Sequence, residues 1–374
     1  PRPFVTATSP AQLTRVAYSA AHVVADPLAA INPTLDCAVD WDATIAYRQY
    51  LWRMGLGVAE AMDTAQRGMG MDWPQSLELI RRSTDAAKDI PGALLASGCG
   101  TDQLAPEDAR SVDDVIRAYE EQMAAIEAVG GRLILMASRA LAKVARGPAD
   151  YEKVYDHILR QAKQPVILHW LGDMFDPALK GYWGSNNVSQ AVDTALGVMA
   201  ANAAKVDGIK MSLLDKDIEI AVRRRLPAGV RMYTGDDFNY AELIAGNEIS
   251  KSANHCHSDA LLGIFDAIAP AASAALLALA QDDRKKFDEI LAPTVPLSRH
   301  MFGAPTRFYK TGVVFMAWLN GHQTHFTMVG GQQNARSLPH FVELFRLADG
   351  AGLLQKPELA VVRMKTLLAL HGAV

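Results

Sequence analysis

Lys205-Val206-Asp207-Gly208-Ile209-Lys210 is the stretch that decides the fold of this chain. It is a short apolar run that ends in a lysine and is followed at once by a charged helical pattern over 215–225. Desolvation at the carboxyl end of a buried strand lowers the pKa of an amine, as an attack on a carbonyl group to form a Schiff base requires. The alternative is a lysine whose stem reaches from the strand end to water.

The rest of the chain repeats this alternation of apolar run and helical pattern. The predicted strands cover 15–24, 56–62, 91–97, 132–137, 165–170, 206–210, 230–234 and 249–253. The predicted helices between them cover 41–54, 73–88, 111–129, 150–163, 187–201, 215–225 and 237–246. Eight strand–helix repeats predict an α/β fold, a (β/α)8 TIM barrel over 1–265. The Ala- and Leu-rich remainder, 266–374, is broken by prolines and predicts a C-terminal helical extension packed on the barrel.

A second motif, Tyr233-Thr234-Gly235-Asp236-Asp237, ends the seventh predicted strand. The carboxyl ends of barrel strands carry the chemistry of this fold, so Gly235 and Asp236 are expected to contact substrate. The alternative for the aspartate is structural, because Asp directly before a helix often caps its free N–H groups.

On these motifs the chain resembles the dihydrodipicolinate synthase / N-acetylneuraminate lyase superfamily of lysine-dependent barrels. Gly208-Ile209-Lys210 is similar to the strand-six motif of the superfamily, and Gly235-Asp236-Asp237 is similar to the motif after its strand seven. The run 249–254 looks like its strand-eight segment, and 304–310 is similar to its C-terminal helices. The resemblance implies that Lys210 forms the Schiff base with a 2-oxo acid.

Two departures indicate a divergent branch. The superfamily holds the substrate carboxylate with Gly-Thr-Thr-Gly-Glu after strand two, where this chain has Asp63 and Thr64. A carboxylate there would repel an oxo acid, so both residues are expected to bind substrate hydroxyl groups, with capping or a salt bridge as the alternative. The superfamily's proton-relaying tyrosine after strand five is replaced by His169. Histidine titrates near neutral pH, so we expect His169 to move protons in catalysis; the alternative is a histidine packed at the strand end and bonded to backbone.

Asn254, His255 and His257 follow the eighth predicted strand and are expected to contact substrate at the barrel mouth. Two histidines one residue apart on an extended segment point the same way, as zinc or iron ligands can. This spacing keeps open a divalent transition metal at His255 and His257. The leading interpretation has no metal and no cofactor, because lysine-dependent lyases need none.

Composition limits the class of protein. The chain has 374 residues, a net charge of −4 and three cysteines whose spacing does not suggest disulfide pairs. The sequence shows no stripe of basic residues and no signal-peptide pattern, and no apolar run is long enough to span a membrane. We therefore expect no nucleic-acid partner and no membrane association. We expect a cytoplasmic location and a homo-oligomer, a dimer or tetramer, through apolar helices around 267–279.

The sequence thus predicts a lyase of the aldolase type. Lys210 would attack a 2-oxo acid or related ketone, including one derived from a sugar acid, and aldol cleavage, condensation or dehydration would follow. One alternative is a metal-dependent barrel hydrolase or isomerase that uses His255 and His257. The other is a barrel without catalysis that binds a ligand.

Overall fold

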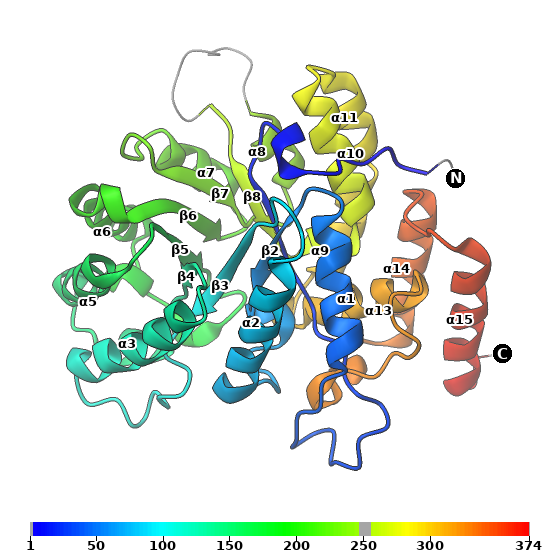
Figure 1. The fold of residues 1–374 in the computed structure, drawn as a ribbon, viewed down its shortest axis with the longest axis horizontal. Helices are drawn as coiled ribbons and strands as arrows, with labels where there is room; N and C mark the ends of the chain where they lie inside the picture. Colours follow the sequence, from blue (N-terminus) through cyan, green and yellow to red (C-terminus); the bar gives the residue numbers. More distant parts are fainter. Residues whose placement is uncertain (1–2, 247–255, 374) are drawn as a thin grey trace. The chain divides into compact units, whose positions relative to one another are not determined.

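The computed structural model describes residues 3–246 and 256–373. Its strands follow one another in chain order around a closed barrel (Figure 1). They are β1 (Ala17–Ala20), β2 (Gly57–Glu60), β3 (Leu95–Cys99), β4 (Leu133–Leu135), β5 (Val166–Leu171), β6 (Val206–Ser212), β7 (Arg231–Thr234) and β8 (Asp259–Leu262). The predicted (β/α)8 barrel is confirmed.

Helices follow the strands as the repeat predicted. Those between the strands are α1 (Trp41–Trp52), α2 (Trp73–Ala87), α3 (Val112–Ala128), α4 (Arg139–Val144), α5 (Pro148–Gln161), α6 (Val188–Ala201), α7 (Lys216–Arg223) and α8 (Tyr240–Ala245). The C-terminal helices are α9 (Ile264–Ala267), α10 (Ala269–Ala280), α11 (Arg284–Leu291), α12 (Thr294–Met301), α13 (Tyr309–Leu319), α14 (Leu338–Gly350) and α15 (Pro357–Leu370). Within the described residues, no helix combines the length and the apolar character that a membrane crossing requires.

The chain divides into two compact units. Unit 1 holds Pro1–Met71, Asp85–Leu94 and Leu262–Val374, and unit 2 holds Asp72–Thr84 and Leu95–Leu261. In unit 2, neighbouring strands from β3 to β8 pair in parallel, and α5 packs between α3 and α6 outside them (Figure 1). In unit 1, α13 contacts α9, α14 and α15. The division predicted at residue 265 follows the repeat of the sequence and stays a prediction.

Local sequence explains the helix positions. Ser111 and Asp114 form a capping box that starts α3, so two otherwise free N–H groups are satisfied. Asp215 accepts two backbone N–H groups at the start of α7. The strands of unit 2 are buried along nearly their whole length, because helices cover the outer face of a parallel sheet. Their continuous apolar runs made these strands easy to predict.

The predicted position of the eighth strand is wrong. The barrel is completed by β8, whose four residues are all buried, and the predicted run 249–253 lies outside the described residues. Asp259-Ala260-Leu261-Leu262 carries the apolar character that a strand enclosed on both faces needs. His257 therefore precedes the eighth strand and lies at its amino end, where the sequence had placed it beyond the carboxyl end.

The apolar helix that motivated the expected homo-oligomer is a core helix of unit 1. The buried residues of α10 are Ala269, Ala271, Ala272, Ser273, Ala274, Ala275, Leu276 and Ala278. Its small side chains allow α11 to pack closely against it. The composition of this helix is thus explained by packing within the chain, and self-association stays a prediction.

Candidate active site

Lys210 lies in the middle of a row of three side chains on adjacent strands. In β5, β6 and β7 the parallel register pairs His169 with Lys210 and Lys210 with Tyr233. The three residues are 1%, 5% and 1% exposed. Residues in register on parallel strands point to the same face, with backbones about 4.8 Å apart. The structure therefore brings His169 beside Lys210, well within the 10 Å or so that a small ligand and two side chains span.

Glycine at position 235 lets the chain turn directly against this lysine. A Cβ atom on Gly235 would lie 2.9 Å from Cε of Lys210 and 2.3 Å from Oγ of Ser212. The same serine Oγ lies 3.4 Å from Nε2 of His169, a long hydrogen bond. Lys210, His169, Ser212 and Gly235 thus form one buried cluster, which we call the lysine cluster. Ser212 is a member that the sequence reasoning missed, although its place two residues after Lys210 on the same strand gives it the same face.

Tyr233, which is in register with Lys210, directs its hydroxyl group toward the amino end of β6. Its hydroxyl donates to Oδ2 of Asp207 at 2.6 Å, near the amino end of β6. Asp207 also forms an ion pair with Arg132 at 2.8 Å. Gly208 makes room for the ring, because a Cβ atom there would lie 2.6 Å from it. The tyrosine hydroxyl is therefore held away from the carboxyl ends of the strands.

Asp236 closes the turn that precedes α8. Its Oδ1 accepts the backbone N–H groups of Phe238 and Asn239 at 2.9 and 3.0 Å, and its Oδ2 accepts from the Asn239 amide at 2.8 Å. Burial raises the pKa of this carboxyl above its ordinary value, and these hydrogen bonds oppose the rise. These bonds lie within the turn before α8, whose N-cap is Asn239, so the alternative that Asp236 caps this helix is wrong. A role of Asp236 in binding substrate stays a prediction.

In unit 1, Asp63 and Thr64 meet two residues that start α13. Both belong to the short helix Asp63–Ala65 after β2. The Tyr309 hydroxyl donates to Oδ2 of Asp63 at 2.8 Å and lies 2.6 Å from Oγ1 of Thr64. Nζ of Lys310, a residue only 3% exposed, lies 3.9 Å from the same carboxylate. This ammonium balances the charge of Asp63, so the repulsion of an oxo acid expected from Asp63 is offset.

A histidine–carboxylate pair in unit 1 was missed by the sequence reasoning. Nδ1 of His22 lies 2.8 Å from Oδ2 of Asp266, which also accepts the backbone N–H of His22 at 2.8 Å. The carbonyl of His22 accepts from Arg48, whose guanidinium is paired with buried Glu60. Both members are fully buried, and the structure shows no partner for Nε2 of His22 among the described residues. In the sequence, His22 is a polar residue inside the predicted strand 15–24, and nothing there pointed to Asp266.

Of the three substrate contacts predicted at 254–257, the structure describes only His257. Asn254 and His255 lie outside the described residues. His257 precedes β8, and its Nδ1 lies 3.4 Å from Sγ of Cys256. Over residues 3–246 and 256–373, no three His, Cys, Asp or Glu side chains are grouped so that they could hold a metal ion. The metal alternative at His255 and His257 needs His255, which lies outside the described residues, so it stays a prediction.

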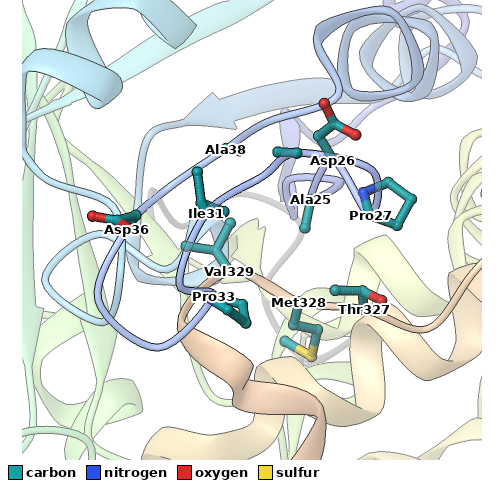
Figure 2. Close-up of a pocket in the computed structure, with 11 residues that line it drawn as sticks. Ala25, Asp26, Pro27, Ile31, Pro33, Asp36, Ala38, Thr327, Met328 and Val329 are labelled. Carbon is teal, nitrogen blue, oxygen red and sulfur yellow. The ribbon is translucent and has the colours of Figure 1, made fainter.

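A cavity of about 250 Å³ in unit 1 contains none of the predicted site residues (Figure 2). It lies between the loop 25–38 that follows β1 and the segment 327–329. Its two carboxylates cap backbone turns: Asp26 accepts from the N–H of Leu28, and Asp36 accepts from the N–H of Asn32. The apolar part of the cavity lining includes Ile31, Met328 and Val329 (Figure 2). This cavity is a packing feature of the loop.

Comparison with solved structures agrees with the barrel. The chain is similar to dihydrodipicolinate synthase from Aquifex aeolicus, with 12% identity, a TM-score of 0.66, and coverage of 91% of this chain and 99% of that one. It is similar to a putative dihydrodipicolinate synthetase from Pseudomonas aeruginosa (13%, 0.66, 90% and 99%) and to the synthase from Cyanidioschyzon merolae with lysine bound (14%, 0.66, 90% and 98%). At this identity the likeness establishes the fold alone, including the C-terminal helices.

A search of the curated proteins finds no significant match. A family model described as a protein of unknown function, DUF993, matches residues 2–373, which is nearly the whole chain. The chain therefore belongs to the DUF993 family, whose fold, as seen here, is the barrel of the dihydrodipicolinate synthases.

Proposed function

We propose that this protein is a lyase of the aldolase type in which Lys210 forms a Schiff base with a 2-oxo acid or a related ketone. The observation that carries the proposal is the register of β5 and β6, which sets His169 beside a buried lysine. Nζ of Lys210 adds to the carbonyl carbon, the carbinolamine loses water, and the protonated imine withdraws electrons from the neighbouring carbon–carbon bond. The bond to that carbon then breaks or forms.

His169 is the proposed proton carrier. The carbinolamine must gain a proton on its hydroxyl group before water leaves, and the next step moves a proton to or from the substrate carbon or hydroxyl group. An imidazole on the strand beside Lys210 is within reach of both positions. Its Nε2 is near Ser212 Oγ, which can fix the orientation of the ring.

The substrate class follows from the second cluster of polar side chains. Asp63 and Thr64 are engaged with Tyr309 and Lys310, and the four side chains offer hydroxyl groups, a carboxylate and an ammonium. We propose that Asp63 and Thr64 bind hydroxyl groups of the substrate, as a 2-oxo acid derived from a sugar acid would carry. The roles of Gly235, Asp236, Asn254, His255 and His257 in binding, a homo-oligomeric state and a cytoplasmic location stay predictions.

Imine trapping tests the proposal. The purified protein is incubated with a panel of 2-oxo acids and ketones, beginning with pyruvate and 2-oxo sugar acids, and reduced with borohydride. Peptide mass spectrometry is expected to find the adduct mass on the peptide that carries Lys210. Lys163→Ala, a change at an exposed surface lysine, should trap equally well. Absence of any adduct across the panel, or an adduct confined to other lysines, would overturn the mechanism.

A further inference from the structure

Glu219 is a buried carboxyl group that the proposed chemistry does not use. It lies on α7 and is 2% exposed. The hydroxyl group of Thr234 donates to its Oε2 at 2.9 Å, and the hydroxyl group of Ser258 donates to its Oε1 at 2.7 Å. A fully buried acidic side chain is rare, and its burial costs free energy unless its oxygens are hydrogen-bonded. Both oxygens of Glu219 meet this condition.

The two hydroxyl partners join separate segments of unit 2. Thr234 is the last residue of β7, and its Oγ1 accepts the backbone N–H of Asp236 at 3.2 Å. Ser258 directly precedes β8 and accepts from Nη1 of Arg223 at 3.0 Å. Both Arg223 and the backbone N–H of Ser258 donate to the carbonyl of Leu243 in α8. One carboxyl group thus ties α7 to the end of β7, the start of β8 and α8.

The end of β7 is the part of this network that reaches the lysine cluster. The N–H of Gly235 donates to the carbonyl of Met211 at 2.8 Å. This bond holds the Gly235 backbone where even one added carbon would lie 2.9 Å from Cε of Lys210. The turn at Gly235 and Asp236 is therefore one wall of the lysine's surroundings, and a shift of the turn changes how the amine is held.

We propose that Glu219 is a positioning residue for Lys210: through Thr234 and Ser258 it holds the Gly235–Asp236 turn against the lysine. It does so as a neutral carboxyl group that donates its proton to one of the two hydroxyl oxygens and accepts from the other, and its ionisation places a buried anion in the network and releases the turn. This inference rests on the proposed function for its consequence in catalysis. The positioning itself rests on hydrogen bonds within unit 2 and can be tested without a substrate.

Several groups face Glu219 and decide how it ionises. Burial raises the pKa of Glu219 to about 8, hydrogen bonds from Ser258 and Thr234 oppose the rise, the Asp236 carboxylate adds to it, and Arg223 on the same helix opposes it. From the β8 side the neighbour is the neutral hydroxyl group of Ser258, and from α8 it is the Leu243 carbonyl that binds Arg223. Ionisation therefore places a buried anion beside a second carboxylate.

The direction of the pH dependence follows from this raised pKa. In the closed state the Gly235–Asp236 turn is held against Lys210, and in the open state it is released. Because the pKa of Glu219 is higher in the closed state, its neutral carboxyl group stabilises the closed state fully below its ordinary pKa. That stability declines as the pH rises and is lost once the pH passes about 8, the closed-state value. Above that point both states are ionised and no further loss is expected.

Amide hydrogen exchange of the full-length protein tests the positioning. Protection factors of the peptide spanning 234–239, corrected for intrinsic exchange, are expected to fall about tenfold or more between about pH 5 and pH 8 and then to level off. Glu219→Gln keeps the shape of the side chain, with one acceptor oxygen and an NH₂ group that donates as the neutral carboxyl does, but it cannot ionise, so its profile should be flat. Glu242→Gln, a change in an exposed ion pair with Lys216, is the matched control and should follow the wild-type profile.

Two further variants keep the test decisive if Glu219→Gln does not fold. Thr234→Val removes the hydroxyl link and should lower protection of the peptide at pH 5, whereas Thr234→Ser should restore it. The same pH-dependent loss of protection in Glu219→Gln as in the wild type would overturn the proposal. Unchanged protection in Thr234→Val would overturn it as well.

The catalytic consequence has its own measurement. The rate of borohydride trapping with pyruvate is measured for Glu219→Gln and for the wild type, and the first rate is divided by the second. This ratio should rise about tenfold or more from about pH 5 to pH 8, because only the wild type loses the positioning of Lys210. The intrinsic pH dependence of imine formation cancels in the ratio. A constant ratio would overturn the link to Lys210. If the wild type traps nothing at Lys210, the proposed function fails, while the exchange experiment still decides whether Glu219 holds the turn.

Discussion

Among the described residues, two lysines are buried, Lys210 in unit 2 and Lys310 in unit 1, and they lie in different surroundings. Lys310 is 3% exposed and lies near the Asp63 carboxylate, and its Nζ donates to the carbonyl of Arg307 at 2.9 Å. Lys210 is 5% exposed and lies in register between His169 and Tyr233, with its Cε against Gly235. A nearby carboxylate favours the ammonium form of an amine, whereas attack on a carbonyl needs the neutral form.

The comparison teaches that burial alone does not identify a reactive lysine. The groups around each amine decide which protonation state of the lysine is favoured. Lys310 begins a helix and is paired with residues near the end of β2, which suits binding and charge balance. Strand register holds Lys210 beside a group that can carry protons, and four experiments test the difference between the two lysines.

Lys210→Ala is expected to have the largest effect. Loss of the amine should abolish the borohydride adduct at this position and lower turnover by about 10³-fold or more, because the group proposed to form the imine is removed. Peptide mapping should find no adduct mass on the peptide that carries Lys310, in the wild type or in the variant. An adduct on Lys310 would break the comparison, and full turnover by Lys210→Ala would end the proposed mechanism.

His169→Ala should have the next largest effect. Loss of a proton carrier lowers turnover by about 10²–10⁴-fold, while the lysine can still form some adduct. Single-turnover measurements should therefore show a larger loss in the conversion of the imine than in its formation. If the loss of activity is fully explained by a loss of folded protein, the histidine only packs between the strands.

Asp63→Asn tests the other lysine. The change removes the carboxylate near buried Lys310 and should destabilise the protein by about 1–3 kcal/mol, since a buried ammonium loses its compensating charge. The matched control is Asp113→Asn at an exposed ion pair with Lys153, where the change should be within about 0.5 kcal/mol. Denaturant unfolding of both variants measures the difference, and equal effects would show that the Asp63–Lys310 pair contributes no more than a surface pair.

The smallest expected effect is the contribution of His322 in unit 1 to the loss of folding stability at low pH. Burial lowers the pKa of His322 from 6.5 to about 4, and its ring lies against Tyr47 and Tyr50. Because the folded pKa is depressed, this contribution to stability is present above about pH 6.5 and is lost as the pH falls to about 4. Glu219 in unit 2 acts in the opposite direction, with stability lost as the pH rises to about 8.

Unfolding midpoints across this pH range measure the histidine contribution. His322→Phe keeps an aromatic ring beside both tyrosines and should flatten the acid side of the profile. The control is His157→Gln, a change at a half-exposed surface histidine, which should leave the acid side as in the wild type. An unchanged acid side in His322→Phe would show that another group of unit 1 is responsible.

The fold could be predicted where local sequence and burial agree. Strands β5, β6 and β7 are parallel and enclosed, so they appear as continuous apolar runs, and helices such as α3 carry their own capping residues. The eighth strand was misplaced because two short runs near the end of the barrel compete, and only closure of the barrel selects Asp259–Leu262. That error moved His257 from the carboxyl end of a strand to the amino end.

The site divides in the same way. The sequence by itself determined that Lys210 lies in a buried strand, that Gly235 and Asp236 follow the next strand, and that His169 lies near the end of the strand before. Strand periodicity and spacing act over a few residues, so one chain is enough to read them. Only the tertiary structure decided that Ser212 and Gly235 close around the lysine and that Glu219 supports the turn beside it.

Packing also brings Tyr309 and Lys310 to Asp63. Tyr309 lies 246 residues from Asp63 in the chain. The same holds for His22 and Asp266, which lie 244 residues apart. Such pairs depend on which buried polar groups need a partner once helices and strands have packed, and no local pattern records that need. Local pattern thus fixed the barrel and the place of Lys210 on a strand, and packing decided which side chains surround each buried amine, because contacts between distant segments form only when the elements pack.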